Sequence, residues 1–376
     1  MYDSSSSSNS SNNPGHEELM LQSTTRLLRG MLYAALVAAI AVVAVFGYKA
    51  IEDKSAMRKS QDEIVSWHGL VAPTSKHLAS EFTDKSGRLL ADPPSDPEKL
   101  LDPETIVVAH YQDSDKATQI VDWGDFQAFL TKATGKKAVL QEYQNSADDI
   151  AAIKQGKTQV VALHAADAPY IVNNAGFIPV AVLASESAAH GNRLDLAVRT
   201  SSDIKTLADI KGHTLTCSAP DSITGYRAAV ALLAQEASLR PSVDYNIAFS
   251  FGQKRSVLGI ASGEFEVAAL SDDKLQSLLK LGDVKEANYR VIYHSEVIPR
   301  LTIGYVYNLR PELADKIAKA ILEFKNEKGD TEDSAGAPLH FITTDYKKDF
   351  ELVRRIDDSF DPRFAKSPKG KRDSSG

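Results

Sequence analysis

The chain of 376 residues has little cysteine, and Cys217 is its single thiol. One thiol excludes an intramolecular disulfide and argues strongly against a cysteine-based zinc site. The sequence also lacks a P-loop, an HExxH pattern and a Gly-x-Ser-x-Gly pattern, which are typical of ATPases, metalloproteases and serine hydrolases. We therefore predict no catalytic residue, metal site or cofactor, and we expect a protein that is not an enzyme.

A basic surface is also missing. The 43 Lys and Arg residues are outnumbered by 50 Asp and Glu residues, the net charge is -7, and no basic stripe recurs in the body of the chain. These features exclude a typical nucleic-acid-binding protein. Two adjacent acidic pairs, Asp148–Asp149 and Asp272–Asp273, are interpreted as solvated surface, because neighbouring residues of a helix point apart. The length suits one large two-lobed unit with additional segments.

The N-terminal region contains the longest apolar run. Residues 1–29 are largely polar and of low complexity at their start, and they are predicted to be disordered. Residues 30–48 carry no charge and are long enough, at about 1.5 Å per residue, to cross a ~30 Å hydrocarbon layer. A cleaved signal peptide is the alternative, but the run starts late and no small-x-small cleavage site follows it. We favour an uncleaved, single-span membrane anchor.

The orientation of this anchor is ambiguous from charge alone. More basic residues follow the run than precede it, which would place the large domain in the cytoplasm under the positive-inside rule. The rule weakens where a long domain follows the span. Residues 49–103, with a polar helix expected within 56–82 and a Pro- and Asp-rich loop after it, are interpreted as a stalk.

From residue 104 the pattern alternates between strands and helices. Strands are expected at 106–110, 137–143, 158–164, 177–184, 193–200, 213–219, 244–252, 265–271, 289–295 and 301–308. Helices are expected at 125–135, 146–156, 169–176, 206–212, 224–237, 254–263, 273–282 and 310–326. The alternation predicts an α/β fold with mostly parallel sheets. Residues 363–376 form a basic, polar tail that we expect to be disordered.

The most informative segment is CSAPDSITGYRAAVALL, Cys217–Leu233, in which a strand leads through a polar elbow into a helix. Ser222 and Thr224 stand at the helix start, and Gly225 permits close approach of the backbone. A helix N-terminus offers unpaired N–H groups and a partial positive charge, so the elbow is a candidate anion site. A plain N-cap that binds nothing is the alternative. Cys217 itself is interpreted as a small buried apolar residue.

The segment LAVRTSSDIKTLADIKGHTLTCSAPDSITGYRAAVALL resembles the core of the phosphonate-type periplasmic binding proteins of ABC transporters. The matching positions include Asp209 and Gly212, then Asp221 to Tyr226 in the elbow. Further similarity covers SGEFEVAALSDDKLQSL (262–278), YRVIYHSEVIPRLTIGYVYNLRPEL (289–313) and EYQNSADDIAAIKQGKTQVVALHAADAPYIV in the first half. The resemblance spans about residues 104–330.

The resemblance implies a set of ligand-contacting residues. They are Tyr111, Tyr143, Ser222, Ile223, Thr224, Gly225, Gln253 and Ser271. Ile223 stands where the family has a hydroxyl side chain, and Gln253 stands where the family has a histidine. The family's acidic position falls at Ser271 or Asp272, and this weaker acidic set favours recognition of an oxyanion over recognition of an aminoalkyl tail. His164, at the end of a first-lobe strand, is a further candidate for the cleft, with a structural histidine as the alternative.

The fold implied by the resemblance is a type II periplasmic binding protein fold, with two α/β lobes and a hinge, preceded by one transmembrane helix. Lobe 1 would comprise 104–198 plus 299–362, and lobe 2 would comprise 199–298. Ligand would draw the lobes together by hinge closure. The implied location is the cell membrane, with the binding domain on the extracytoplasmic side.

The implied function is capture of a small phosphorus oxyanion (phosphonate, phosphite or phosphate) for an ABC permease and its ATPase. Two alternatives stay open, since one fold serves many functions. One is a binding module for a sulfonate or a thiamine precursor. The other is a sensor that uses the same fold without transport.

Overall fold

The computed structural model describes scattered residues between 26 and 51, and then residues 78–111, 121–143, 146–185, 191–220, 222–325 and 336–360. The backbone of Tyr111, Tyr143 and residues 146–149 is described, but their side chains are not. The chain divides into two units, residues 1–63 and residues 64–376. Within the described part, no helix is long and apolar enough to cross a membrane. Most of the predicted anchor, 30–48, and most of the helix expected within 56–82 lie outside the described residues.

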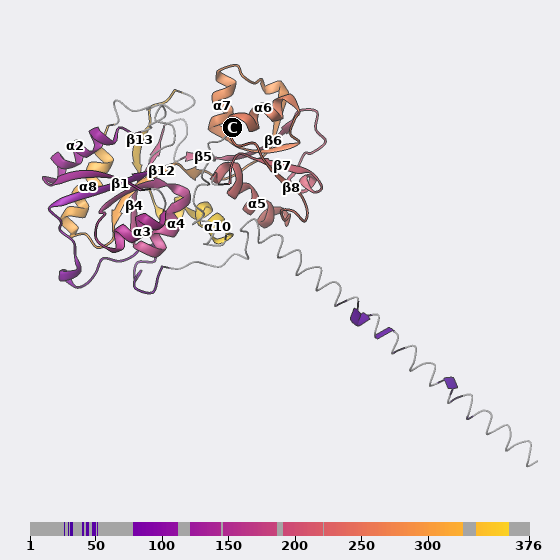
Figure 1. The fold of residues 1–376 in the computed structure, drawn as a ribbon, viewed down its shortest axis with the longest axis horizontal. Coiled ribbons are helices and arrows are strands. Elements are labelled where there is room, and N and C mark those ends of the chain that lie inside the picture. The colour runs from indigo at the N-terminus through magenta and orange to yellow at the C-terminus, as the bar shows by residue number, and fades with distance from the viewer. Residues whose placement is uncertain are drawn as a thin grey trace, which may run out of the picture. The chain divides into compact units, whose positions relative to one another are not determined.

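The second unit contains a six-stranded sheet with the order β13-β4-β12-β3-β1-β2 (Figure 1). Its strands are β1 (Thr105–Tyr111), β2 (Lys137–Tyr143), β3 (Val160–His164), β4 (Phe177–Ala184), β12 (Leu301–Val306) and β13 (His340–Thr343). Its helices are α2 (Trp123–Thr134), α3 (Ser146–Lys154), α4 (Ala168–Ala175) and α8 (Pro311–Glu323). Helices α2 and α8 pack together, and α3 packs with α4.

A five-stranded sheet in the same unit has the order β10-β6-β9-β7-β8. Its strands are β6 (Leu194–Arg199), β7 (Thr214–Cys217), β8 (Asn246–Phe249), β9 (Val267–Ser271) and β10 (Tyr289–His294). The accompanying helices are α5 (Ala228–Ala237), α6 (Gln253–Ser262) and α7 (Asp272–Lys280), with the π-helical turn η5 (Ile223–Arg227) before α5. The short 3-10 segments are η1 (Pro97–Lys99), η3 (Ala165–Asp167), η4 (Leu207–Ile210) and η6 (Glu286–Asn288).

Along the buried central strands of the second sheet, successive side chains point alternately into two different buried clusters, as expected of strands with helices on both faces. Leu196, Val198 and Ala269 belong to the same buried cluster as the apolar residues of α5. Ala197 and Leu270 belong to the cluster that includes apolar residues of α6 and α7. Each strand therefore contributes side chains to both helical layers.

The sheets are mixed, so the expectation of mostly parallel sheets is wrong. Strand β1 pairs in parallel with β2 and β3, and β7 pairs in parallel with β8 and β9. Strand β12 is antiparallel to β3 and β4, and β6 is antiparallel to β9 and β10. The reason is topological: β6 and β12 each enter their sheet directly after the chain has crossed from the other one, without a βαβ connection.

The two crossing segments pair with each other. Strand β5 (Gly191–Asn192) and strand β11 (Ile298–Pro299) form a short antiparallel ribbon. Gly191 is required there, because a Cβ at this position would lie 1.9 Å from the carbonyl oxygen of Ile298. Both expected hinge points, near Val198 and near Pro299, lie in or close to the chain segments that enter and leave this ribbon.

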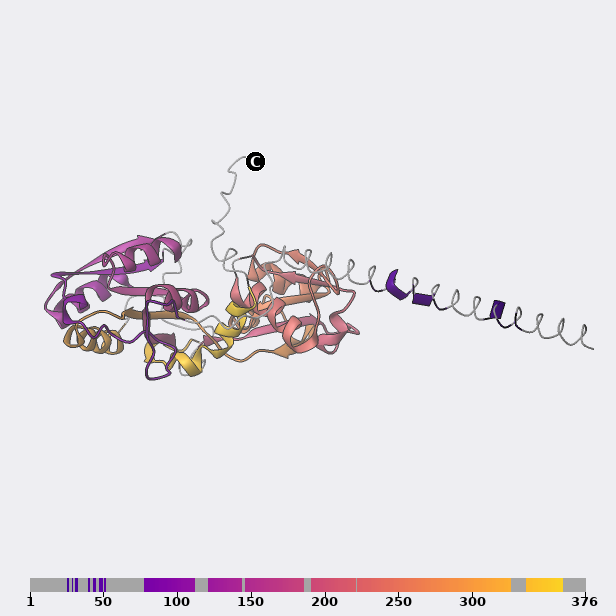
Figure 2. The same ribbon diagram turned by 90° about the horizontal axis from the view of Figure 1, so that it is seen from below.

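The last described helices connect elements of both sheets. Helix α9 (Tyr346–Asp349) is followed by α10 (Glu351–Asp358), which contacts α4 and η3 as well as α5 (Figure 2). Arg227 of η5 forms an ion pair of 3.3 Å with Asp357, and its guanidinium lies over the ring of Phe360. The return segment thus holds the start of α5 in place.

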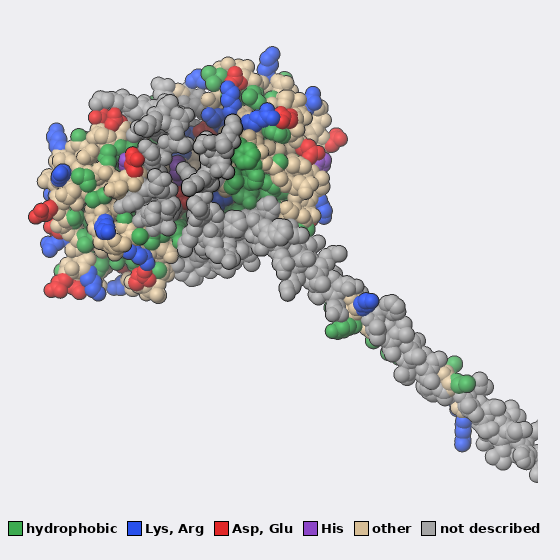
Figure 3. All heavy atoms as spheres, in the orientation of Figure 1, with side chains coloured by type: hydrophobic (Ala, Val, Ile, Leu, Met, Phe, Trp, Pro, Cys, Tyr) green, Lys and Arg blue, Asp and Glu red, His purple; other side chains and the backbone are tan. Residues whose placement is uncertain are grey.

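Part of the predicted stalk packs on the first sheet's helices and loops. Leu90 and Ala91 are buried. The amide of Ala79 donates to the carbonyl of Asn173, and Lys154 forms an ion pair with Glu81. On the face drawn in Figure 3, basic and acidic side chains are interspersed over the described surface. The domain boundaries given above stay predictions.

Candidate ligand-binding site

The elbow after β7 is built as a close-packed turn. The amide of Ser218 donates to the carbonyl of Gly225 at 2.9 Å, which folds the elbow back on the strand end. Ser222 is the N-cap residue, and its hydroxyl oxygen accepts the amide of Gly225 at 2.9 Å. A Cβ on Gly225 would lie 1.8 Å from Ser218 Oγ, so only glycine fits. The expectation of close backbone approach at Gly225 is confirmed by this geometry.

The same elbow presents amide groups without a helical acceptor. The Ser222 hydroxyl oxygen accepts the amide of Gly225, so the hydroxyl proton of Ser222 remains available as a donor. The amides of Ile223 and Thr224 begin the helical segment that continues to Ala237, and the first amides of a helix have no carbonyl within it to bond. Ile223 therefore supplies a backbone donor although its side chain is apolar. Ser222 and Ile223 are half-buried, and Thr224 is buried.

Gln253 joins the elbow to the end of β9. It begins α6, directly after the loop that leaves β8. Its Nε2 donates to Thr224 Oγ1 at 3.4 Å, and its Oε1 accepts the amide of Ser271 at 3.1 Å. Gln253 thereby links two other predicted ligand residues, Thr224 of η5 and Ser271 of β9. They lie at the carboxyl ends of the parallel strands β7, β8 and β9, which is where ligands bind in open α/β sheets.

Tyr111 and Tyr143 end β1 and β2 and are register partners at the carboxyl end of the first sheet. Their side chains lie outside what the structure describes, so their role in ligand contact stays a prediction. His164 ends β3 and is exposed. Cys217 is buried and reduced, as expected, and burial raises the pKa of its thiol.

The acidic pair at the start of α7 was not recognised as part of this region. Asp272 and Asp273 are half-buried, so their interpretation as solvated surface is wrong. Asp272 Oδ1 accepts the amides of Arg193 and Asp273, while burial raises the pKa of its carboxyl group. Asp273 Oδ1 accepts the hydroxyl of Ser271 at 2.5 Å. Acidic residues stabilise a helix N-terminus, and that position was the available signal.

Arg300 was also not identified as a site residue, although it lies within the family-like segment 289–313, because the resemblance assigned it no ligand contact. Its Nη2 lies 3.6 Å from Asp273 Oδ2, and its carbonyl accepts the amide of Ala165. It brings a positive charge to the group formed by Thr224, Gln253, Ser271 and Asp273, which we call the edge cluster.

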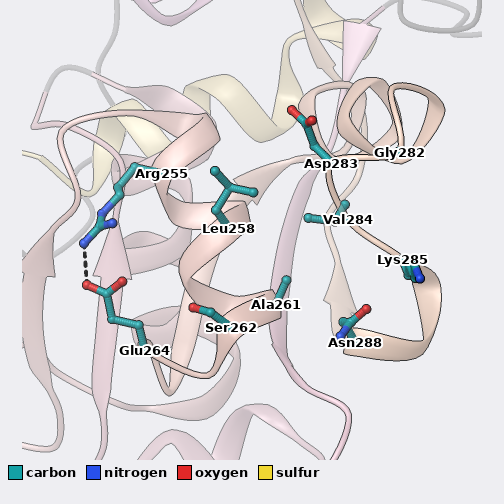
Figure 4. A pocket seen from close by; sticks show the side chains of 10 residues that line it. All are labelled: Arg255, Leu258, Ala261, Ser262, Glu264, Gly282, Asp283, Val284, Lys285 and Asn288. Carbon is teal, nitrogen blue, oxygen red and sulfur yellow. Dashed lines mark hydrogen bonds and ion pairs between the residues drawn. The ribbon is translucent and has the colours of Figure 1, made fainter.

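A separate depression lies beside α6 (Figure 4). It has a volume of about 500 Å³ and lies between α6 with the turn after it and the segment 282–288, which includes η6. Arg255 and Glu264, which form an ion pair, lie on one side of it, and Asp283 and Lys285 lie on the other. Its lining shares no residue with the edge cluster. Within the described part of the chain, no group of three His, Cys, Asp or Glu residues could hold a metal ion.

Comparison with known proteins identifies the family. The family model described as ABC transporter, phosphonate, periplasmic substrate-binding protein matches residues 106–344. The phosphate-import protein PhnD of Mycolicibacterium smegmatis is 24% identical over 240 residues, which cover 60% of this chain and 74% of that protein.

Solved structures agree on the fold. The protein XAC2383 from Xanthomonas citri bound to ATP aligns with a TM-score of 0.54 at 12% identity, covering 69% of this chain and all of that one. Its chloride-bound form aligns with a TM-score of 0.52 at 13% identity, covering 68% of this chain and 98% of that one. The family match, which includes the elbow and the edge cluster, shows that this chain belongs to the periplasmic substrate-binding proteins of phosphonate ABC transporters.

Proposed function

We propose that this protein is a membrane-anchored receptor that captures a small phosphorus oxyanion at the elbow after β7 and delivers it to an ABC importer. The observation that carries the proposal is the elbow itself. Its first amides point out of a helix start, its glycine is packed on Ser218, and its Thr224 hydroxyl accepts a hydrogen bond from Gln253, which in turn accepts the amide of Ser271. Such an arrangement concentrates hydrogen-bond donors on an anion with little steric bulk.

The choice of a phosphorus oxyanion rests on donor chemistry. The elbow offers amides and hydroxyls, which suit the several oxygens of a phosphoryl group. Gln253 in place of the family's histidine retains a donor but removes a titratable group. Because the mycobacterial relative is a phosphate-import protein, inorganic phosphate is the favoured ligand among the candidates. Permease and ATPase subunits are the partners that the family implies.

The membrane anchor is part of the proposal. Residues 30–48 form a run without charge that is long enough to span a bilayer, and the family is periplasmic. Anchoring would keep the binding domain close to its permease. Extraction of the protein by detergent but not by carbonate would support it, and release by high salt alone would contradict it.

The ligand proposal is tested by thermal shift of the purified full-length chain. The panel contains phosphate, phosphite, methylphosphonate, 2-aminoethylphosphonate, sulfate and taurine, with ATP included because of the ligand of the Xanthomonas protein. A ligand at 100 times its Kd stabilises the folded state by about 2.7 kcal/mol. A shift with sulfate or taurine alone would instead identify a sulfur oxyanion receptor. If no phosphorus compound shifts the melting temperature, the proposal fails.

The elbow is tested by the substitution Thr224→Val, which removes one hydroxyl and keeps the volume. A hydrogen bond to a charged group contributes about 1.5–3 kcal/mol, so we expect affinity to fall roughly 10- to 100-fold. Thr200→Val is the matched control, because Thr200 follows the carboxyl end of β6, which runs antiparallel to β9, and its hydroxyl donates to the carbonyl of Ala287. Equal affinities of both variants would place the ligand elsewhere.

A further inference from the structure

Arg300, beside the edge cluster, has a largely buried guanidinium whose hydrogen bonds are incomplete. Nε and Nη2 of Arg300 are buried and have no hydrogen-bond partner among the described residues. The side chain as a whole is 14% exposed. Buried donors are nearly always bonded, and leaving one unsatisfied costs about 1–3 kcal/mol, more for a charged group.

The two unsatisfied atoms form one chemical unit. Nε–H and an N–H of Nη2 lie on the same edge of the planar guanidinium and point in parallel directions. This edge matches two oxygens of a single phosphate or phosphonate group, which is why arginine is favoured in such sites. The ion pair with Asp273, at 3.6 Å, is too long to count as a hydrogen bond and occupies only the Nη2 end.

Contacts connect this guanidinium to the elbow step by step. Asp273 accepts the hydroxyl of Ser271, the amide of Ser271 donates to Gln253, and Gln253 donates to Thr224. The predicted ligand residues themselves carry no positive charge. Arg300 therefore supplies the positive charge that an anion site at this edge would otherwise lack.

Two residues near Arg300 in the chain or in the crossing ribbon also have buried polar atoms without a hydrogen-bond partner. The buried oxygen Oδ1 of Asn192, in β5, and the hydroxyl of Thr302, in β12, also lack a partner among the described residues. Asn192 pairs with Ile298 in the ribbon that leads directly to Arg300. Other arginines of the unit are satisfied: Arg290 donates to three backbone carbonyls, and Arg227 is paired with Asp357.

We propose that Arg300 binds the oxyanion through its Nε–Nη2 edge, and that Asp273 holds the guanidinium when no ligand is present. The proposal rests on the proposed function and adds the charged residue of the site. Because Arg300 lies where the chain re-enters the first sheet and contacts the start of α7, ligand binding there would act directly on the crossing segments.

The test measures Kd for inorganic phosphate and methylphosphonate by calorimetry, together with melting temperature, in the full-length protein. Arg300→Gln should weaken binding at least 10-fold. Arg300→Lys keeps the charge but not the paired donors, so its affinity should lie between those of the wild type and Arg300→Gln. Asp273→Asn should tighten binding severalfold, because it removes a carboxylate that competes with the anion while its amide oxygen still accepts from Ser271. Arg255→Gln is the control for net charge and should match the wild type, since the exposed Arg255 side chain pairs with Glu264, lies over the ring of Phe265 and bonds no residue of the edge cluster.

The outcomes separate the two proposals. If the wild type binds none of the oxyanions, the proposed function fails. If the wild type binds but Arg300→Gln or Arg300→Lys binds equally well, only the role of Arg300 is overturned. Weaker binding by Asp273→Asn would also overturn it. A merely structural arginine would lower the melting temperature of Arg300→Lys without changing Kd.

Discussion

The packing of Gly225 against Ser218 makes Gly225→Ala a quantitative test of the elbow. The new Cβ would lie 1.8 Å from Ser218 Oγ, 2.7 Å from Ser218 Cβ and 2.8 Å from Ser222 Oγ. Ser218 is 2% exposed and has little room to rotate. Overpacking of this kind costs about 1–3 kcal/mol, and loss of the N-cap bond adds about 1 kcal/mol.

The expected total loss in unfolding free energy is therefore about 3 kcal/mol. At roughly 2 °C per kcal/mol for a large domain, the melting temperature should fall by about 6 °C. Phosphate binding should weaken as well, because the shift displaces the amides of Ile223 and Thr224. Scanning calorimetry with and without phosphate measures both effects.

Two further variants make the test specific. Gly252→Ala is the control, since a Cβ there meets nothing within 4 Å and its backbone is extended. Ser218→Gly combined with Gly225→Ala removes the two closest contacts and should recover part of the stability relative to the sum of the single changes. A Gly225→Ala protein as stable and as tightly binding as the wild type would refute the close packing described here.

Three other predictions concern stability. Burial raises the pKa of Asp195 to about 6 from 3.8, although the hydrogen bond with His294 opposes this shift. The contribution of Asp195 to the free energy of unfolding is therefore fully present below about pH 4 and is lost as pH rises through 6. Asp195→Asn should therefore gain, relative to the wild type, on the order of 3 kcal/mol between pH 4 and 7 in urea titrations, and a flat difference would contradict this. Asp357→Ala strands the buried Arg227 and should cost about 3 kcal/mol by the same assay, whereas Asp283→Ala, which breaks an exposed pair with Lys254, should cost less than about 1 kcal/mol. Phe251 is 81% exposed with a φ of 58°, so Phe251→Asn should stabilise by about 0.5–1 kcal/mol, and an unchanged or lower midpoint would argue that its ring has a packing role.

Most elements could be predicted from residue patterns, because apolar periodicity and turn residues are local. The strands 137–143 and 177–184 match β2 and β4 at both ends. The expected strand 106–110 is one residue shorter than β1 at each end, the other expected strands are one to several residues longer than observed, and 206–212 is a short 3-10 turn, η4. Strand β13 and helices α9 and α10 were not anticipated. Their segment is short and follows a Gly- and acid-rich stretch. Its residues form β13 and α10 through contacts with β4, α4 and α5, which are distant in the sequence.

The site was recognised only where it has a motif. The elbow, Gln253 and Ser271 follow strand ends in order along the chain, so the resemblance could locate them. Arg300 and Asp273 lie within the family-like segments 289–313 and 262–278, but the resemblance assigned them no ligand contact, and their proximity depends on the antiparallel entry of β12 and on the crossing ribbon. The prediction of mostly parallel sheets was wrong for the same reason. Whether a strand is parallel or antiparallel to its neighbours after a crossing depends on contacts between residues far apart in the sequence.

The buried Cys217 gives the molecule a property useful for measuring motion. Because the folded chain hides its single thiol beneath α5 at the end of β7, that thiol reacts with maleimides only when this strand opens. Its labelling rate therefore reports local opening directly below the elbow. Cysteines introduced on the surface of each sheet's helices would be modified selectively without removal of the native one. The protein is thus already suited to paired fluorescent labels that test whether the two lobes move, as proposed, when phosphate is added.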